Sequence, residues 1–271
     1  MASDTLDLAD FYESRSGEVA RHLIRRQIRA LWPSVRGDAI LGLGYSMPYL
    51  RQFRNEAERL LAVVPPGQGM LPQWPAPVAC ATCLAAEEAL PFPNDAFDRI
   101  LLVHCLEHSR QLDDLLREVW RTLKGEGLLL VVAPNRRGLW ARLDRTPFGQ
   151  GRPYSHSQLS RLLREYRFMP LAARDALFMP PSERPWLLRT APAWDRIGAR
   201  WLAQFGGVNL LLARKRVQAL QPSRPVRQSR RPRLVLPAPV GARPYPSRRS
   251  NLQEGKDRQR RESILQSSRF S

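Results

Sequence analysis

The stretch from residue 87 to residue 135 decides the fold class, because two short apolar runs in it flank a periodic segment. It reads EEALPFPNDAFD over residues 87–98, RILLV over 99–103, HCLEH over 104–108 and KGEGLLLVVAPN over 124–135. Between these pieces apolar side chains recur at helical spacing, at Leu112, Leu115, Leu116, Val119 and Leu123. Short apolar strands that alternate with amphipathic helices are typical of a parallel sheet covered on both faces. The sequence therefore predicts an α/β domain, in which Gly125 is expected to cap the helix.

This stretch resembles the second half of class I S-adenosylmethionine-dependent methyltransferases of the type 11 group. The family pattern runs Leu-Pro-Phe, Phe-Asp, a strand, Leu-Glu-His, Leu-Arg-Glu, Leu-Lys-Pro-Gly-Gly, a strand and Pro-Asn, and residues 90–135 follow it in order. The resemblance implies a Rossmann-like, seven-stranded sheet with helices on both faces, in a domain spanning residues 1–213. It also implies methyl transfer from S-adenosylmethionine to an acceptor that the sequence does not identify.

Apolar runs and periodic segments elsewhere supply the other elements of such a sheet. Strands are predicted at residues 39–43, 59–64, 78–84, 100–103, 128–132, 170–173 and 208–213. Helices are predicted at residues 16–32, 112–123, 157–166 and 194–205.

Positive charge is concentrated at the end of the chain. Residues 214–271 contain 16 Lys and Arg but three Asp and Glu, so they carry +13 of the total net charge of +18. They also contain seven prolines and only scattered apolar residues. Such a segment buries too little apolar surface to offset the entropy lost on ordering. We therefore predict a disordered basic tail over residues 214–271, with RNA or another polyanion as its partner; a solvated tail without a specific partner is the alternative.

The sequence also indicates a compartment. No apolar run reaches the ~18 residues needed to cross a bilayer, and the acidic N-terminus does not follow the layout of a signal peptide. Three cysteines, Cys80, Cys83 and Cys105, do not suggest a disulfide framework in a chain of 271 residues. The predicted location is the cytosol.

The predicted cofactor site lies past the carboxyl ends of the strands, where open α/β sheets bind their ligands. The family's first loop, Asp-x-Gly-x-Gly-x-Gly, aligns with residues 42–48, which read GLGYSMP. The resemblance implies that Gly42, Gly44 and Tyr45 contact the cofactor, with Gly42 at the position of the acid and two further glycines missing. A tight strand-to-helix turn that binds no ligand is the alternative explanation of the two glycines. Gly44→Val is expected to block the approach of the cofactor to the backbone at only a modest loss of stability.

The resemblance places further cofactor contacts after the later strands. The acid that would hold the ribose hydroxyls is missing after the second strand, where Pro65 aligns. After the third strand, Ala86 aligns with an acid that contacts adenine in the family. The adjacent Glu87 or Glu88 is expected to take that role, and a solvated loop carboxylate is the alternative. His104 and Cys105 follow the fourth strand, beside the transferable methyl group. Because the motif is degenerate, the alternative is an inactive methyltransferase-like binding module that acts through its basic surface.

Two motifs allow a metal interpretation. His104-Cys-Leu-Glu-His108 fits the His-x-x-Glu-His pattern of inverted zinc peptidases, which requires a helix and a separate carboxylate ligand. Here the motif directly follows a strand. Cys80-x-x-Cys83 has no second cysteine pair, so two apolar strand residues explain it. We therefore predict no metal site, and no catalytic base is identified.

The connection 136–154 interleaves arginines with Trp140, Phe148 and Tyr154 on the ligand side of the sheet. Arginines among aromatic side chains suit a nucleobase, a phosphate or another acidic substrate. A solvated loop whose aromatic side chains pack on the core explains the same pattern. His156 is a candidate base in this region, and a loop histidine without a catalytic role is the alternative.

Overall fold

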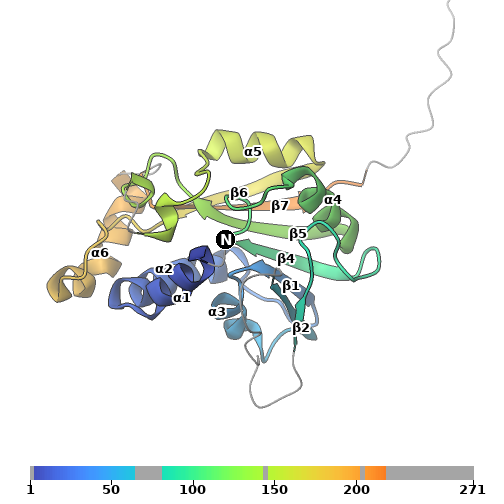
Figure 1. Cartoon of the computed structure of the whole chain (residues 1–271), viewed down its shortest axis with the longest axis horizontal. Coiled ribbons are helices and arrows are strands. Elements are labelled where there is room, and N and C mark those ends of the chain that lie inside the picture. Colours follow the sequence, from blue (N-terminus) through green and yellow to red (C-terminus); the bar gives the residue numbers. More distant parts are fainter. Residues whose placement is uncertain (1–2, 65–80, 143–145, 202–204, 218–271) are drawn as a thin grey trace, which may run out of the picture. The chain divides into compact units, whose positions relative to one another are not determined.

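The computed structural model describes residues 3–64, 81–142, 146–201 and 205–217, which lie in the first of two units of the chain, Met1–Leu220. Within it, one sheet has the strand order β3-β2-β1-β4-β5-β7-β6 (Figure 1). The strands are β1 (Ala39–Gly44), β2 (Arg59–Val64), β3 (Thr82–Leu84), β4 (Phe97–Val103), β5 (Leu123–Pro134), β6 (Phe168–Ala176) and β7 (Val208–Lys215). β7 runs antiparallel to its neighbours, and the other pairs are parallel. The predicted seven-stranded sheet is confirmed.

Helices cover both faces of this sheet, as predicted (Figure 1). The α-helices are α1 (Ser3–Glu13), α2 (Arg15–Leu31), α3 (Met47–Leu50), α4 (Leu112–Thr122), α5 (His156–Glu165) and α6 (Pro185–Trp201). The described residues also form the short 3₁₀ helices η1 (Arg51–Phe53), η2 (Trp140–Arg142) and η3 (Pro147–Gly149). Residues of α1, α2, α3 and α6 pack against one face, and residues of α4 and α5 against the other.

The apolar strands explain why both faces are covered. Successive side chains of a strand point to opposite faces. In β1, Ile40 packs with the α1–α2 side and Leu41 with the α4–α5 side; in β4, Leu101 and Leu102 divide in the same way. A strand that is apolar at every position therefore requires a helical layer on each side.

Several elements differ from the prediction, among them α3, which the sequence does not predict. The helix α1 is not predicted, and α6 begins earlier than expected, at Pro185. The expectation that Gly125 caps α4 is wrong. Leu123 already has an extended backbone and begins β5, where it pairs with Phe97, so Gly125 lies inside the strand. The burial of Leu123 against the sheet therefore ends the helix before the glycine is reached.

The last strand continues past residue 213, where the sequence places the end of the domain. Lys215 belongs to β7, and its ammonium donates hydrogen bonds to the Leu123 carbonyl (2.6 Å) and to Asp95 Oδ1 (2.7 Å). The predicted tail otherwise falls outside the described residues, which end at residue 217. None of the described helices combines the length and the apolar character that crossing a bilayer requires.

Candidate functional site

The candidate site lies where the carboxyl ends of β1 and β4 meet. Gly44, the last residue of β1, pairs with Val103, the last residue of β4. Gly44 has φ +67°, and a Cβ atom there would lie 2.3 Å from the Val103 carbonyl oxygen and 3.1 Å from the Cβ atom of Cys105. The next amide, that of Tyr45, donates a hydrogen bond to the same carbonyl at 2.8 Å. Only glycine therefore allows the two strand ends to approach this closely.

Gly42 packs closely against the turn that follows β1. It lies inside β1, two residues before the strand ends. A Cβ atom at this position would lie 2.3 Å from the Ser46 hydroxyl and 2.7 Å from a methyl group of Leu50. The structure therefore explains Gly42 by the packing of the turn and α3 on the strand.

Of the two glutamates after β3, only Glu87 faces the site. The Cys105 thiol donates a hydrogen bond to Glu87 Oε1 at 3.4 Å, and this joins the end of β4 to the segment after β3. Burial raises the pKa of the Glu87 carboxyl and, more strongly, that of the Cys105 thiol, whose proximity to Glu87 raises it further. Cys105 is therefore a neutral thiol and not a thiolate nucleophile. Glu88 is exposed.

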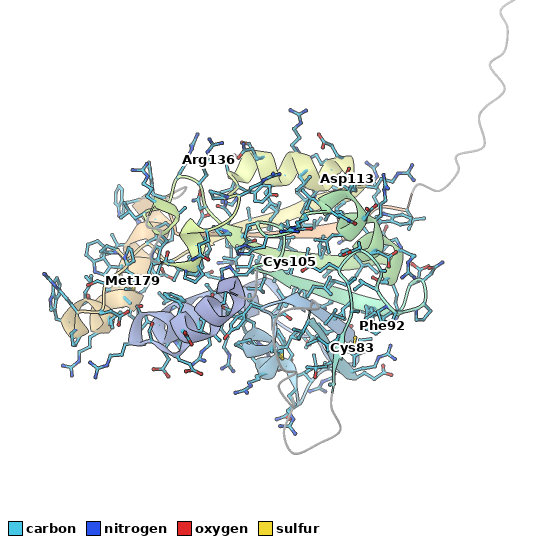
Figure 2. The ribbon with its side chains drawn as sticks, viewed as in Figure 1. Cys83, Phe92, Cys105, Asp113, Arg136 and Met179 are labelled. Carbon is cyan, nitrogen blue, oxygen red and sulfur yellow. The ribbon has the colours of Figure 1, made fainter. Side chains whose placement is uncertain are left out.

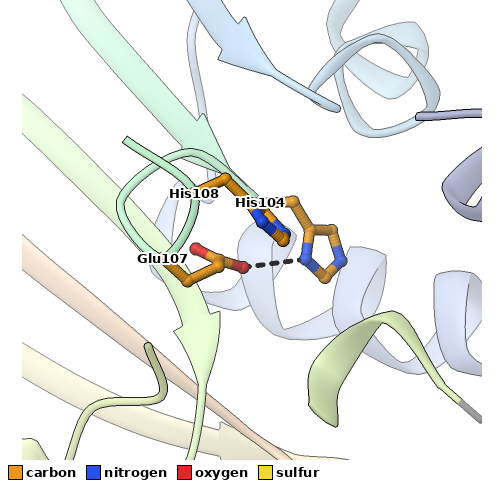
Figure 3. A group of neighbouring side chains, drawn as sticks. All are labelled: His104, Glu107 and His108. Carbon is orange, nitrogen blue, oxygen red and sulfur yellow. Dashed lines mark hydrogen bonds and ion pairs between the residues drawn. The ribbon is translucent and has the colours of Figure 1, made fainter. Parts of the chain in front are cut away.

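His104 begins a turn after β4 that carries a buried polar network (Figure 3). Its Nδ1 lies 2.9 Å from Glu107 Oε1, and its Nε2 lies 2.8 Å from the hydroxyl of Tyr12 in α1. The backbone of His104 has φ +50°. A left-handed conformation in a residue other than glycine costs about 1–3 kcal/mol and occurs often at functional sites. The side chains of His104 and Glu107 are almost fully buried.

The helix α1 covers the end of β1 and β4. Tyr12 stacks on the Tyr45 ring with 4.8 Å between the ring centroids and 12° between the planes, and it accepts a hydrogen bond from the Tyr49 hydroxyl at 3.0 Å. Burial raises the pKa of Tyr12 well above its usual value, so its hydroxyl remains neutral. Sequence reasoning missed Tyr12. The signal was present in the i, i+3, i+4 spacing of Leu8, Phe11 and Tyr12.

The sequence allows two interpretations of the connection 136–154, a binding loop for an acidic ligand and a loop whose aromatic side chains pack on the core. Different residues of the connection fit each of them. Trp140 and Phe148 are fully buried and their rings meet edge to face, so core packing is their role. Tyr154 is half-buried and borders a pocket of about 740 Å³. Arg136 and Arg152 line the same pocket, and Figure 2 shows Arg136 near α5.

Backbone hydrogen bonds hold this pocket beside the turn after β4. The Arg136 amide donates to the Tyr154 carbonyl at 3.1 Å, and the Tyr154 amide donates to Pro134 at the end of β5 at 3.0 Å. The Arg152 amide donates to the Glu107 carbonyl at 3.1 Å. Within the described part of the chain, no acid forms an ion pair with Arg136 or Arg152.

Other sequence candidates lie apart from this point. His156, the candidate base, is hydrogen-bonded through Nε2 to Asp175 of β6 at 2.7 Å. Cys83 is half-buried in β3, whereas Cys80 and the predicted strand residues 78–80 lie outside the described residues. Pro65, which aligns with the missing acid, also lies outside them.

Comparison with known families and structures agrees with this architecture. The family profile of a methyltransferase domain, type 11, matches residues 41–131, which run from β1 into β5. An S-adenosylmethionine-dependent methyltransferase from Thermotoga maritima superposes with a TM-score of 0.53 and 16% identity, covering 74% of this chain and 91% of that one.

Two further solved structures share the fold. The protein assigned as a methyltransferase in a Haloferax volcanii complex with the Trm112 methyltransferase activator gives a TM-score of 0.57 and 15% identity, covering 78% of this chain and 98% of that one. An S-adenosylmethionine-dependent methyltransferase from Archaeoglobus fulgidus gives a TM-score of 0.50 and 15% identity, covering 72% of this chain and 94% of that one. No curated protein matches the chain in sequence.

Proposed function

We propose that this chain, which belongs to the class I S-adenosylmethionine-dependent methyltransferases of the type 11 group, binds S-adenosylmethionine past the ends of β1 and β4. There it transfers the methyl group to an acceptor that carries an acidic group. The observation that carries the proposal is the convergence of the sequence candidates. Gly44, Tyr45, Glu87, His104 and Cys105 come from three separate segments and meet at the carboxyl edge of the sheet.

In methyl transfer the main task of the protein is to position the reactants. S-adenosylmethionine supplies an already activated methyl group, so the protein must bind and orient the reactants and exclude water. We infer that the carboxylate of Glu87 accepts a hydrogen bond from the cofactor. The helix α1 closes the site through Tyr12, whose burial shows how little water reaches the end of β4. Binding and release of the cofactor then require α1 to move.

The pocket bordered by Arg136, Arg152 and Tyr154 is our proposed acceptor site. Arg152 is fixed to Glu107 through the backbone, so the pocket adjoins the turn that carries His104. Guanidinium groups that form no ion pair with an acid of the described residues suit a phosphate or a carboxylate, which they bind in a bidentate manner.

Glu87→Gln is expected to weaken binding of S-adenosylmethionine, or of its demethylated product, by roughly 10-fold or more. Hydrogen bonds to charged groups contribute about 1.5–3 kcal/mol, and the amide keeps the size of the side chain but not its charge. Isothermal titration calorimetry on the full chain measures the effect. Glu88→Gln is the matched control, because Glu88 is adjacent but exposed. We expect this variant to bind the cofactor within about twofold of the affinity of the natural sequence.

Equal losses in the two variants would contradict the assignment of Glu87. No binding of either ligand at several millimolar would contradict the enzymatic proposal and favour a second one, a methyltransferase-like binding module without cofactor. A specific observation supports this alternative. The Tyr45 amide is already hydrogen-bonded to Val103, and Tyr12 packs against the Tyr45 ring where a nucleotide would lie.

For the basic C-terminal tail we propose RNA or another polyanion as the partner, and the cytosol as the compartment. Deletion of residues 218–271, which leaves β7 intact, is expected to lower the affinity for single-stranded RNA. It should also flatten the dependence of the binding constant on salt, since fewer phosphates are neutralised. Fluorescence anisotropy at several salt concentrations measures both effects. An unchanged affinity and salt slope would show that the tail does not bind RNA.

A further inference from the structure

We propose that His104, Glu107 and His108 form a binding site for a divalent transition-metal ion, and that Zn²⁺ fits it best. One ligand atom from each side chain lies within 4.8 Å of the others. All three residues belong to the turn between β4 and α4, and Figure 3 shows the His108 ring beside the hydrogen-bonded pair of His104 and Glu107.

The burial of Glu107 is the first argument. Its side chain has no exposed surface, and Oε1 has one partner, the His104 ring at 2.9 Å. Oε2 is buried and has no hydrogen-bond partner among the described residues. Buried carboxylates in proteins are paired, hydrogen-bonded or bound to metal ions, because removing them from water is costly. A cation between Glu107 and the neighbouring rings would satisfy the remaining oxygen.

The His108 ring provides a second, independent observation. Its Nε2 atom is also buried and also lacks a hydrogen-bond partner in the part of the chain that the structure describes. Unsatisfied buried polar atoms are rare enough in native proteins that each one calls for an explanation, such as a bound ion or water. Here a carboxylate oxygen and an imidazole nitrogen from the same ligand cluster are both unsatisfied. One ion explains both.

Neighbouring residues fix the orientation of the proposed ligands through hydrogen bonds, as is usual at metal sites. The second ring nitrogen of a metal-bound histidine normally has a polar partner that fixes the ring orientation. The Nε2 atom of His104 has such a partner in the Tyr12 hydroxyl at 2.8 Å. The turn itself is fixed by the Ser109 amide, which donates to the Cys105 carbonyl at 3.0 Å, and by the Arg152 amide on the Glu107 carbonyl at 3.1 Å.

The ligand chemistry selects the metal. Two imidazoles and one carboxylate suit Zn²⁺ and its first-row neighbours, whereas Mg²⁺ and Ca²⁺ prefer oxygen ligands. Zinc lies about 2.0–2.2 Å from such ligands and tolerates varied geometry. The ligand atoms of His104, Glu107 and His108 lie within 4.8 Å of one another, so small side-chain movements would let all three contact one ion. The same His-x-x-Glu-His order lies on a helix in zinc peptidases. Here it lies on a turn, so the site departs from the peptidase arrangement and also from our sequence-based prediction of no metal.

The full chain, freed of metal by a chelator, tests the proposal by titration with Zn²⁺ in a calorimeter and with Co²⁺ by visible absorption. We expect one high-affinity ion per chain. Glu107→Gln and His108→Gln should each weaken Zn²⁺ binding by roughly 100-fold or more, since even residues that only orient a ligand account for 10- to 100-fold. Tyr12→Phe, which removes the hydroxyl beside His104, should weaken it by roughly 10-fold.

The histidines and the cysteine pair outside the proposed site serve as controls, because histidine and cysteine are common zinc ligands. The double variant His22→Gln/His156→Gln removes the remaining histidines, and Cys80→Ser/Cys83→Ser removes the cysteine pair. Both should bind one Zn²⁺ as tightly as the natural sequence. Circular dichroism melts verify that each variant is folded, and if Glu107→Gln does not fold, His108→Gln carries the test.

Three results would overturn the proposal: no binding of Zn²⁺ or Co²⁺, binding unchanged in a folded ligand variant, or binding lost in either control. The measurement contains no S-adenosylmethionine, so its outcome is separate from that of the methyltransferase proposal.

Discussion

Gly44→Ala is expected to lower the free energy of unfolding by about 2–5 kcal/mol. A left-handed backbone costs an alanine about 1–2 kcal/mol, and Gly44 has φ +67°. The new methyl group would also lie 2.3 Å from the Val103 carbonyl oxygen, which is backbone in the neighbouring strand and cannot rotate away. Overpacking of this kind adds about 1–3 kcal/mol. Urea denaturation followed by circular dichroism measures the loss.

Gly37→Ala separates the two contributions. Gly37 also has a positive φ, +79°, but among the described residues no atom beyond its chain neighbours lies within 4 Å of the position a Cβ would take. This variant should therefore lose only the conformational part, about 1–2 kcal/mol. Equal losses in the two variants would contradict the close approach of β1 and β4 at Gly44.

The same geometry corrects an expectation drawn from the sequence. Gly44→Val was expected to block cofactor approach with only a modest loss of stability, but the contact with Val103 makes a large loss unavoidable. A lost ligand response in that variant would therefore not locate the cofactor. Glu87→Gln is the better probe, because its side chain lies at the site without supporting a strand pairing.

The sheet was predictable because its strands are short and apolar at nearly every position. Residues 39–43 and 100–103 match β1 and β4 closely, since a strand buried on both faces leaves a continuous apolar run in the sequence. The helix α4 shows a regular apolar spacing and was also found. The end of α4 was not predicted correctly. Leu123 belongs to β5 because of its tertiary packing, which outweighs the local signal of Gly125.

The candidate site was predictable only in part, because its contacts join distant parts of the chain. The resemblance indicated His104 and Cys105, and local sequence placed both at the end of a strand. It did not indicate that Tyr12 lies against His104, a contact across 92 residues. Nor did it separate Glu87 from Glu88, since only the contact with Cys105 shows which of the two faces inward.

The aromatic residues of the connection 136–154 were likewise ambiguous, because the same side chains suit a stacked base and a packed core. Trp140 is fully buried, and its ring meets Phe11 and Phe148 edge to face, with interplanar angles of 84° and 82°. Its indole N–H donates a hydrogen bond to the Met179 carbonyl at 2.7 Å. These contacts fasten the connection to α1 and to the segment after β6, so the pocket formed by Arg136 and Arg152 depends on Trp140 through packing.

Trp140→Ala is therefore expected to lower the free energy of unfolding by about 3–5 kcal/mol, the usual cost of removing a large aromatic side chain from a core. The substitution also leaves the Met179 carbonyl without its donor. Trp201→Ala is the matched control, since Trp201 is 76% exposed, and it should change stability by about 0.5 kcal/mol or less. Chemical denaturation of both variants measures the difference. If Trp140→Ala unfolded like the natural sequence but lost binding of acidic ligands, the ring would have to be a contact of the acceptor, and the packed connection described here would be wrong.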